Sequence, residues 1–568
     1  MTKKGTRIAV AAALAVAGIS ALAVAGSATP PDYPYLSNVA TANTKAVGYA
    51  PASKLSTELR QLAQAQGSTQ LENPTALTGF YGYQNDVVSA DDPTKPQMVP
   101  TAGFGNESHK TEPDKNTYLV FKRSHRGADP NYYYGRHFLY QGHENAVAVN
   151  GKKQGYITRI NLDADAKHRV TLLSTQDSTG QPIATIDGST WDPWAQQLIL
   201  TTESASAPTY AATPDYPSTV TDVSGALGRG GYEGIQNDSA GNLIIVEDIG
   251  GSNKAGATKA KMPNSFVYRY VPAKPGDLQN GKLQVLQVLN EAGLPITFNS
   301  ESTFPSADQT ALHTYGKVFQ TRWVTIHDSA VDGHAPFNAN TWAKGLQTTP
   351  AQPAANQGTP FKRPENGQFR PGSHFRQFYF DETGDTDATS SENGNPVTGA
   401  DGVGGWGGIL KLTQQQPTDD TGELTLFYKG NKSVTGLDNV SFLSKNLITF
   451  VEDAGDTLHG QRNALDSGYV WDVTVDYSDP AKQPVRWLAE GRDPSATIDS
   501  SFSFSKNDGD NEITGTTVSD GNPTPEGILG AKDPHLFKEG WRWFYTQQHG
   551  DNTTWEVVPA SGREHDDD

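Results

Sequence analysis

Two stretches of this sequence share one layout, and that layout decides the fold. They are Glu233-Gly-Ile-Gln-Asn-Asp-Ser-Ala-Gly-Asn-Leu-Ile-Ile-Val-Glu247 and Asp438-Asn-Val-Ser-Phe-Leu-Ser-Lys-Asn-Leu-Ile-Thr-Phe-Val-Glu452. Each begins with an acid, continues through turn-forming residues and ends with an apolar, β-branched run that leads to a second acid. Asp187 and Glu203 bracket a third segment of this kind. The pattern predicts short antiparallel strands rather than helices.

Other strand patterns recur beside these stretches. A strand that opens with Gly or Ser and is mainly apolar recurs at 155–160, 265–270, 408–412 and 468–473, and a Val- and Leu-rich strand follows each copy. Recurrence of one small antiparallel sheet predicts an all-β fold, namely a β-propeller of about six blades. A β-sandwich or a pair of barrels would have similar strands and is the alternative.

We expect the first strand of each blade to end on an acid or a histidine. Loop-forming stretches at 205–230, 290–360 and 385–405 indicate long insertions between strands. At 53–65, Leu59 and Leu62 have helical spacing, which predicts a short N-terminal helical segment. The expected ends of the first strands are His143-Glu144, Glu203, Glu247-Asp248, Asp381-Glu382, Glu452-Asp453 and His549.

The N-terminus has the layout of a secretory signal peptide. Basic residues precede an apolar run over 8–25, and small residues and two prolines follow it. A membrane anchor is the alternative, but the Ala-rich run and its small-residue end favour cleavage. We therefore expect a secreted protein without stable membrane association after cleavage. The expected divisions are a signal peptide at 1–28, a segment packing on the propeller at 29–115, the propeller at 116–560 and an acidic tail at 561–568.

The composition excludes several classes of site. The chain has 568 residues, a formal net charge of −18 and no cysteine. It therefore has no disulfide, no Cys-ligated zinc site, no iron–sulfur cluster and no thiol nucleophile. An acidic chain without a basic block is also a poor partner for nucleic acid. The excess of acidic residues either forms a solvated surface or includes ligands for cations. We expect the protein to be a monomer.

Acids at equivalent strand ends would converge near one end of a propeller's central channel. Glu365 and Glu512 have the character of opening acids of two further units. Carboxylates cannot share a semi-enclosed site unpaired, because repulsion and desolvation would force protonation. Bound cations remove that problem, and oxygen ligands suit hard ions such as Ca²⁺, Mg²⁺, Mn²⁺ or Fe³⁺. A turn-capping role is the alternative for any one acid, and repetition favours metal.

Arg363 is a further candidate functional residue. A guanidinium beside an acidic metal cluster suits a phosphate or carboxylate substrate, and a salt bridge to a neighbouring acid is the alternative. His143 and His549 are candidate ligands, phosphate donors or packed polar residues. The sequence has no Gly-x-Ser-x-Gly elbow in the relevant positions and no P-loop, so neither a serine hydrolase nor a nucleotide site is indicated.

Several short motifs, taken in order along the chain, resemble the PhoX-type alkaline phosphatase family. The resemblance is scattered but collinear over about 137–550. Its motifs are Gly142-His143-Glu144-Asn145, Trp191-Asp192-Pro193-Trp194 with Thr201-Thr202-Glu203, Arg363-Pro364-Glu365, Asp438-Asn439-Val440, Glu452-Asp453, and Glu512-Ile513-Thr514-Gly515 with Phe544-Tyr545-Thr546-Gln547-Gln548-His549-Gly550.

The resemblance implies a secreted β-propeller phosphatase that holds calcium and iron mainly with carboxylates. It makes Arg363 a phosphate contact, His549 a second one, and Arg363 and Glu233 the catalytic candidates. Family members carry a Cys immediately before the position of Glu203, where this chain has Thr202. This departure favours Ca²⁺ over Fe³⁺ as the cofactor. The metal-ligand candidates are Glu144, Glu203, Glu233, Glu365, Glu452 and Glu512.

The expected activity is metal-assisted hydrolysis of phosphate monoesters, with a small phosphorylated molecule as the substrate. Two alternatives stay open on the sequence. One is a phosphodiesterase or phytase that uses the same cluster, and the other is a non-catalytic propeller in which calcium only joins the blades.

Overall fold

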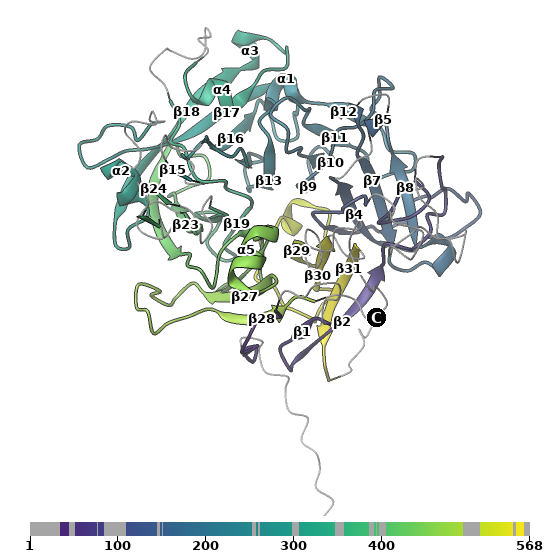
Figure 1. The fold of residues 1–568 in the computed structure, drawn as a ribbon. Helices are drawn as coiled ribbons and strands as arrows, with labels where there is room; N and C mark the ends of the chain where they lie inside the picture. Colours follow the sequence, from purple (N-terminus) through teal and green to yellow (C-terminus); the bar gives the residue numbers. More distant parts are fainter. Residues whose placement is uncertain are drawn as a thin grey trace, which may run out of the picture. The chain divides into compact units, whose positions relative to one another are not determined.

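The computed structural model describes residues 35–44, 52–76, 78–84, 110–144, 148–149, 152–252, 257–258, 262–297, 306–346, 357–384, 391–392, 395–396, 405–491, 512–548 and 552–561. Within the unit Leu36–Asp568, they form an all-β, propeller-like arrangement of sheets around a common centre (Figure 1). The expected signal peptide at 1–28, all but the first residue of the expected tail, and His549 lie outside the described residues.

Four of the sheets have four or five antiparallel strands each. One consists of β3 (Thr117–Val120), β4 (His137–His143), β7 (Tyr156–Asn161) and β8 (Val170–Ser174), and the next of β9 (Ser189–Asp192), β10 (Gln197–Leu200), β11 (Tyr210–Ala212) and β12 (Val220–Asp222). A third consists of β25 (Leu437–Phe442), β26 (Leu447–Glu452), β27 (Ser467–Asp472), β28 (Val485–Ala489) and β1 (Lys54–Leu55). The fourth consists of β29 (Glu512–Ser519), β30 (Arg542–Gln548), β31 (Thr553–Pro559) and β2 (Leu59–Ala65).

The largest sheet has nine strands. In spatial order they are β13 (Tyr232–Asn237), β14 (Leu243–Glu247), β16 (Val267–Pro272), β17 (Gly281–Val288), β18 (Val318–Asp328), β24 (Thr421–Lys429), β23 (Gly408–Thr413), β20 (Gln377–Glu382) and β19 (Gly367–Phe369). Small sheets are formed by β15 (Ala257–Thr258) with β21 (Ser391–Glu392) and β22 (Asn395–Pro396), and by β5 (Ala148–Val149) with β6 (Lys152–Lys153). The short helices are α1 (Ser224–Leu227), α2 (Ala307–Leu312), α3 (Ser329–Asp332), α4 (Ala339–Ala343) and α5 (Gly455–Arg462).

An inner ring of strands organises the sheets. It consists of β3, β9, β13, β19, β25 and β29, each of which lies at one end of its sheet. These strands contact one another in chain order, and β29 contacts β3. Figure 1 shows the same progression of colour around the centre, where the yellow C-terminal strands meet the purple N-terminal ones. The ring brings strand starts that are far apart in sequence to one place.

The strands that we expected to come first in each blade are the second strands of the sheets. β4, β10, β14, β20, β26 and β30 each pair with the inner-ring strand that precedes them in the chain. The inner strands are mostly buried, and β13, β19 and β29 contain Gly. Buried positions around a channel lack the alternation of a half-exposed strand.

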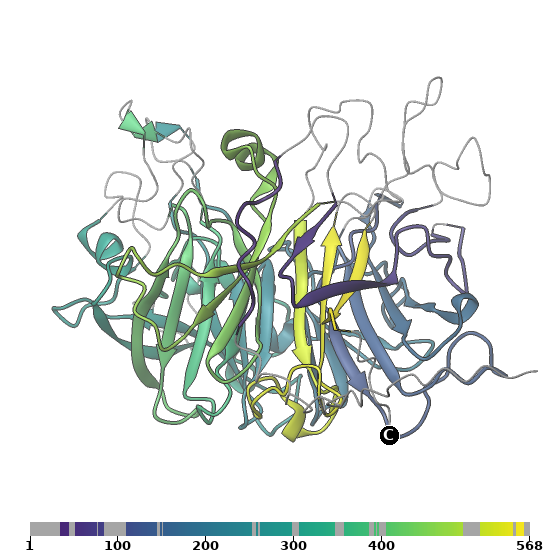
Figure 2. The ribbon, with the colours of Figure 1, turned by 90° about the horizontal axis from the view of Figure 1, so that it is seen from below.

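The predicted helical segment at 53–65 is wrong, because this segment forms two strands. Lys54 of β1 pairs with Ala489 of β28, and Leu59 of β2 pairs with Pro559 of β31. Figure 2 shows purple β2 beside the yellow C-terminal strands. The residues of β2 are good helix formers, but pairing with an open sheet edge overrides that weak local preference.

The predicted loop insertions also contain regular structure. The stretch 205–230 includes β11 and β12, which complete the second sheet, and 290–360 includes β18, which joins the two halves of the largest sheet. Part of 385–405 lies outside the described residues. The stretches 205–230 and 290–360 also contain the short helices α1, α2, α3 and α4, so the prediction of loops is wrong over these parts. Short strands with few apolar residues do not stand out from loops in a sequence.

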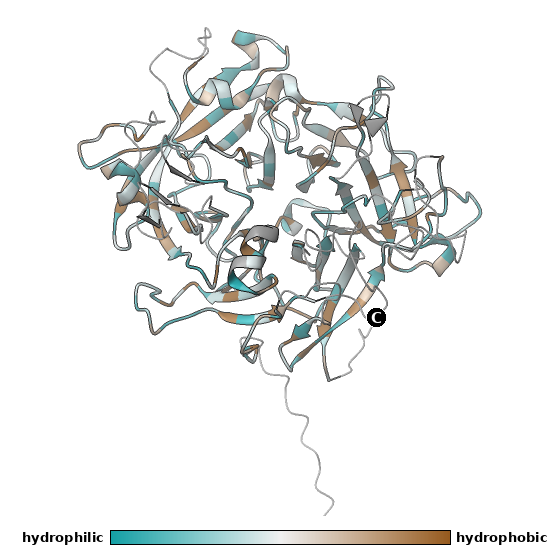
Figure 3. Ribbon diagram, viewed as in Figure 1, coloured by the Kyte–Doolittle hydropathy of each residue, from teal (hydrophilic) through white to brown (hydrophobic). Residues whose placement is uncertain are grey.

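Hydrophobic side chains join neighbouring sheets. Phe138 and Tyr140 of β4 belong to the same buried cluster as Leu198 and Leu200 of β10. Brown, hydrophobic segments lie largely on the strands in Figure 3. Sheet-to-sheet packing therefore holds the inner ring in place.

Among the described residues, no helix has the length and apolar character needed to cross a membrane.

The strand β2 gives a direct test, because a helix would place Leu59 and Leu62 on one face whereas a strand separates them. Leu59 is 6% exposed and Leu62 is 37% exposed. We expect Leu59→Ala to lower the free energy of unfolding by about 2–5 kcal/mol, and Leu62→Ala by about 0.5 kcal/mol. Denaturant titration of both variants measures this difference. Equal losses would contradict the strand register.

Candidate metal centre

Each inner-ring strand carries an acid at or just before its start. The side chains belong to Asp114, Asp187, Glu233, Glu365, Asp438 and Glu512. Because the strands contact one another in sequence around the ring, their starts converge at one end of it. Three further acids come from residues that follow second strands, namely Glu144 after β4, Glu203 after β10 and Asp248 after β14.

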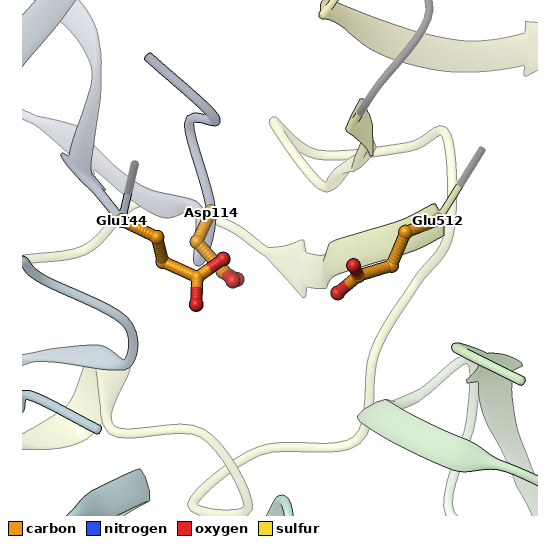
Figure 4. Close-up of side chains that lie close together, drawn as sticks. All are labelled: Asp114, Glu144 and Glu512. Atoms are coloured by element: carbon orange, nitrogen blue, oxygen red, sulfur yellow. The ribbon is translucent and has the colours of Figure 1, made fainter. Parts of the chain in front are cut away.

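These nine residues form what we call the carboxylate centre. Overlapping groups of three have carboxylate oxygens within 4.8 Å of one another. Figure 4 shows one group, in which Asp114, Glu144 and Glu512 point toward each other from separate segments. The other groups are Asp114–Asp187–Glu233, Glu144–Asp187–Glu203, Glu203–Glu233–Asp248 and Glu233–Glu365–Asp438.

Two glycines let the inner strands approach closely enough for this convergence. A Cβ at Gly188 would lie 1.8 Å from the carbonyl oxygen of Glu233. A Cβ at Gly234 would lie 2.7 Å from the carbonyl oxygen of Glu365. Neither position accommodates a side chain without moving backbone. Each glycine neighbours a centre acid in sequence, so the same positions set both the strand spacing and the separation of the carboxylates.

Burial is the largest cause of the raised pKa values in the carboxylate centre, and repulsion between the acids adds to it. Burial, with repulsion from Asp187, raises the pKa of Glu233 well above its usual range. Burial, with repulsion from Asp248, does the same to the pKa of Glu365. Burial also raises the pKa of Asp114 to about 6, although hydrogen bonds oppose that shift. Ionised carboxylates at these distances therefore need positive charge between them.

The donor set fits hard metal ions. Asp187 is 2% exposed, and its Oδ1 accepts no hydrogen bond from the described residues. Every side chain of the carboxylate centre offers oxygen ligands, which suit Ca²⁺ and, among trivalent ions, Fe³⁺. Thr202 is buried, and its hydroxyl donates to the carbonyl oxygen of Pro208 at 3.0 Å. That hydroxyl is thus engaged outside the centre.

Neutral side chains hold several of the acids in position. Asn439 Nδ2 donates to Asp438 Oδ1 at 2.7 Å and to Thr514 Oγ1 at 3.0 Å, and the Thr514 hydroxyl donates to Asp114. Gln548 Nε2 donates to Asp114 Oδ2 at 3.1 Å and to Glu144 Oε2 at 2.8 Å. This network links three sheets through one set of hydrogen bonds.

Arg363 lies at the edge of the centre and forms the salt bridge that was the alternative to phosphate binding. Its Nε and one terminal nitrogen donate to the two oxygens of Asp248, each at 2.6 Å. The same terminal nitrogen lies 3.6 Å from Glu365. The Arg363 side chain is 32% exposed, so solvent reaches a guanidinium already held beside the acids.

The structure brings together five of the six predicted ligands, and Glu452 belongs to none of the described groups. Its two oxygens accept from Arg462 at 3.1 and 3.2 Å. Glu452 is the last residue of β26, and the equivalent last residues of β4, β14 and β20 also bind neighbouring groups. His143 lies within hydrogen-bond distance of the hydroxyl groups of Thr111 and Thr158. Glu247 accepts hydrogen bonds from the backbone N–H of Phe266 and from Asn340. Glu382 accepts one from the backbone N–H of Lys362 and lies within hydrogen-bond distance of His313.

His143 is a packed polar residue. Burial lowers its pKa to about 3, and its two ring nitrogens lie 2.9 and 2.8 Å from hydroxyl oxygens. The acid of the carboxylate centre is the next residue, Glu144. The same alternation places Glu247 in a structural contact and Asp248 in the centre, because successive side chains of a strand point to opposite faces.

Comparisons with known proteins bear on the fold. The chain matches the solved structure of Pseudomonas fluorescens PhoX in complex with vanadate, a transition state analogue, over 92% of this chain and 98% of that one, with 11% identity and a TM-score of 0.51. Periplasmic gluconolactonase from Pseudomonas aeruginosa matches over 75% of this chain and 97% of that one, with 12% identity and a TM-score of 0.28. A GH43_1 enzyme from Xanthomonas citri matches over 64% and 87%, with 11% identity and a TM-score of 0.25.

No known family's sequence profile matches the chain, and no curated protein sequence does. The match to the PhoX structure supports a PhoX-like fold. At this level of identity the likeness concerns the fold alone, and the chemistry has to be argued from the carboxylate centre.

Glu452 and Glu233 were both ligand candidates in the sequence, but they have different surroundings in the structure. Glu452 binds Arg462, whereas Glu233 belongs to the carboxylate centre. We expect Glu452→Gln to leave calcium affinity unchanged, because its oxygens bind Arg462. Glu233→Gln should weaken calcium binding tenfold or more, equivalent to about 1.4 kcal/mol. Calorimetric titration of calcium into chelator-treated protein measures both values. Similar losses of affinity in the two variants would contradict this assignment.

Proposed function

We propose that this protein is a secreted, metal-dependent phosphatase that hydrolyses phosphate monoesters at the carboxylate centre. The observation that carries the proposal is the convergence of nine carboxyl side chains at one end of the inner ring, with Arg363 exposed beside them. The PhoX-like fold supports it, because the matched structure is that of PhoX in complex with vanadate, a transition state analogue.

Calcium is the cofactor that the donor set favours, and Fe³⁺ is the second candidate. The oxygen ligands suit both ions, but the chain offers no thiolate. The carboxyl oxygens of Asp114, Asp187 and Glu233 would hold a metal between them, as would those of Glu233, Glu365 and Asp438. When bound, the metal supplies positive charge to phosphoryl oxygens and acidifies a water nucleophile.

Arg363 is the proposed substrate-binding and catalytic cation. Its guanidinium is oriented by Asp248 and lies beside Glu365. A phosphoryl group at the centre would meet this fixed cation, whose charge stabilises the negative charge of the transition state. Glu233 is proposed to orient the reacting groups, because it takes part in three of the carboxylate groups. His549 is a proposed second phosphate contact.

The architecture supports a substrate site at one mouth of a propeller. We propose that the largest sheet consists of two blades, β13-β14-β16-β17 and β19-β20-β23-β24, joined at their outer edges by β18. With the other four sheets this gives six blades, closed by β2. The signal-peptide layout of the N-terminus supports export, and the net charge of −18 favours a small phosphorylated substrate over nucleic acid.

Hydrolysis of an aryl phosphate with and without calcium tests the proposal. We expect activity only when metal is present. Arg363→Met and Glu233→Gln should each lower kcat by about 10²–10³, the usual effect of removing a group that stabilises transition-state charge. Arg322→Met serves as the matched control, because Arg322 is exposed on the outer strand β18 and should retain full activity.

The comparison of substrates separates the alternatives. Release of phosphate from monoesters, with little from diesters or inositol phosphates, supports the proposal, and the opposite preference supports a phosphodiesterase or phytase. Calcium binding without release of phosphate from any of them identifies a non-catalytic propeller joined by calcium. Activity that survives complete chelation, or that is unchanged in both variants, contradicts the metal mechanism.

A further inference from the structure

A cavity with basic walls lies at the end of the inner strand β19 that is remote from the carboxylate centre. Glu365 lies two residues before β19, whereas the loop 370–376 follows the last residue of the strand. This loop lines a cavity of about 460 Å³ together with Thr413 at the end of β23 and Lys445 in the turn between β25 and β26. Small-molecule sites in proteins have volumes of about 300–1,000 Å³. The cavity, which we call the basic pocket, is therefore large enough for a small ligand.

Positive charge gathers in the lining of the basic pocket. Arg370 and Arg376 contribute two guanidinium groups, Lys445 contributes an ammonium, and His374 adds an imidazole. The other lining residues are neutral, although the whole chain has 63 acidic residues against 45 Lys and Arg. A pocket lined by basic side chains and no carboxylate runs against the charge of the chain and attracts anions.

The acids recorded near the basic pocket bind backbone groups instead of its cations. Asp533 Oδ1 accepts from the backbone N–H of Lys445 at 2.5 Å, and Asp419 Oδ2 accepts from that of Gln416 at 2.9 Å. Within the described part of the chain, neither acid forms an ion pair with a basic side chain of the pocket. The positive charges of the pocket are therefore left for a ligand.

Neutral acceptors hold the guanidinium of Arg370 in a fixed orientation. Its Nε donates to the carbonyl oxygen of Lys445 at 2.8 Å, and its terminal nitrogens donate to Gln377 Oε1 at 3.0 Å and to Asn446 Oδ1 at 2.7 Å. A guanidinium has five N–H donors, so two remain for a ligand. Arg370 is thus oriented in advance without losing its net charge to a carboxylate.

The backbone of the loop is also fixed. His374 and Phe375 have φ values of 56° and 58°, in the left-handed region that residues other than glycine rarely adopt. Phe375 is buried, and its ring centroid lies 5.2 Å from that of Phe369. Strained backbone of this kind persists only where the surroundings hold it, and it is frequent at binding sites. The buried Phe375 therefore anchors the loop, while His374 and Arg376 on either side of it are exposed.

We propose that the basic pocket binds a small organic phosphate, whose phosphate oxygens contact Arg370, Arg376 and Lys445. Guanidinium groups match the oxygens of a phosphate in pairs, and an ammonium adds a point charge. The pocket has room for more than the phosphate group, and the hydroxyl and amide groups of Ser373 and Gln414 suit a polar organic part.

The basic pocket is proposed as a binding site and not as a second metal centre. None of the acid groups found among the described residues includes a residue of its lining. This inference goes beyond the proposed function and does not depend on it, because the pocket uses neither metal nor any residue of the carboxylate centre.

Calorimetric titration of the calcium-loaded protein with phenylphosphonate tests the inference. The carbon–phosphorus bond of this probe is not an ester, so a phosphatase does not consume it. We expect the exchange of two exposed side chains, Arg376→Gln with Lys445→Gln, to weaken binding at this site at least about tenfold, because charge-assisted hydrogen bonds are lost. Arg136→Gln with Lys167→Gln removes the same charges from exposed positions elsewhere and should leave the affinity unchanged.

Two further measurements identify the site and its chemistry. Arg363→Met should retain phenylphosphonate binding in the basic pocket, and the Arg376→Gln, Lys445→Gln chain should retain the wild-type kcat on an aryl phosphate. Benzenesulfonate has the same ring but a single negative charge, so it should bind at least about tenfold more weakly. Added salt should weaken binding of both probes, because it screens exposed charges.

The outcomes separate this inference from the proposed function. Equal phenylphosphonate affinity in the wild-type and Arg376→Gln, Lys445→Gln chains overturns the basic pocket, and so does complete loss of binding in Arg363→Met. Equal affinity for benzenesulfonate overturns the assignment to a phosphate group. A wild-type chain that binds phenylphosphonate in the basic pocket but hydrolyses no phosphate ester contradicts the proposed function alone.

Discussion

Repulsion among buried carboxylates is the constraint on which the rest of this structure depends. The inner ring brings acids from separate sheets to within 4.8 Å of one another in groups of three, where burial and mutual repulsion raise the pKa values of Glu233 and Asp438. Such a site is unfavourable unless positive charge lies among the acids. The close strand approach at Gly188 and Gly234 shows that the convergence is built into the backbone and is not an accident of flexible side chains.

Positive charge reaches the acids by two routes. Arg363 supplies one charge at the exposed edge of the carboxylate centre, and bound metal would supply the remainder. Hydrogen bonds from Asn439 and Gln548 fix the acids without neutralising them. The arrangement leaves Arg363 partly exposed beside oxygen ligands for metal, and the proposed phosphate site rests on this feature.

The sequence allowed prediction of the all-β class and of several centre acids, because Glu233 and Asp438 start units of equal length. It also made Glu452 a ligand candidate, whereas the structure places that side chain in an ion pair with Arg462 and outside the described groups of acids. Asp114 precedes a short strand outside the recognised repeat, so no pattern marked it. The helix expected at 53–65 failed because local preference is weak against pairing with a sheet edge. Contacts between distant segments decided each of these cases.

The metal content of protein purified without chelator tests the central claim most directly. Elemental analysis should find more than one calcium or iron ion per folded chain, and prolonged chelation should remove them and lower the melting temperature. The five overlapping groups of acids in the carboxylate centre offer places for more than one ion. A folded, monodisperse protein that contains no metal and gains no stability from added calcium would contradict the account.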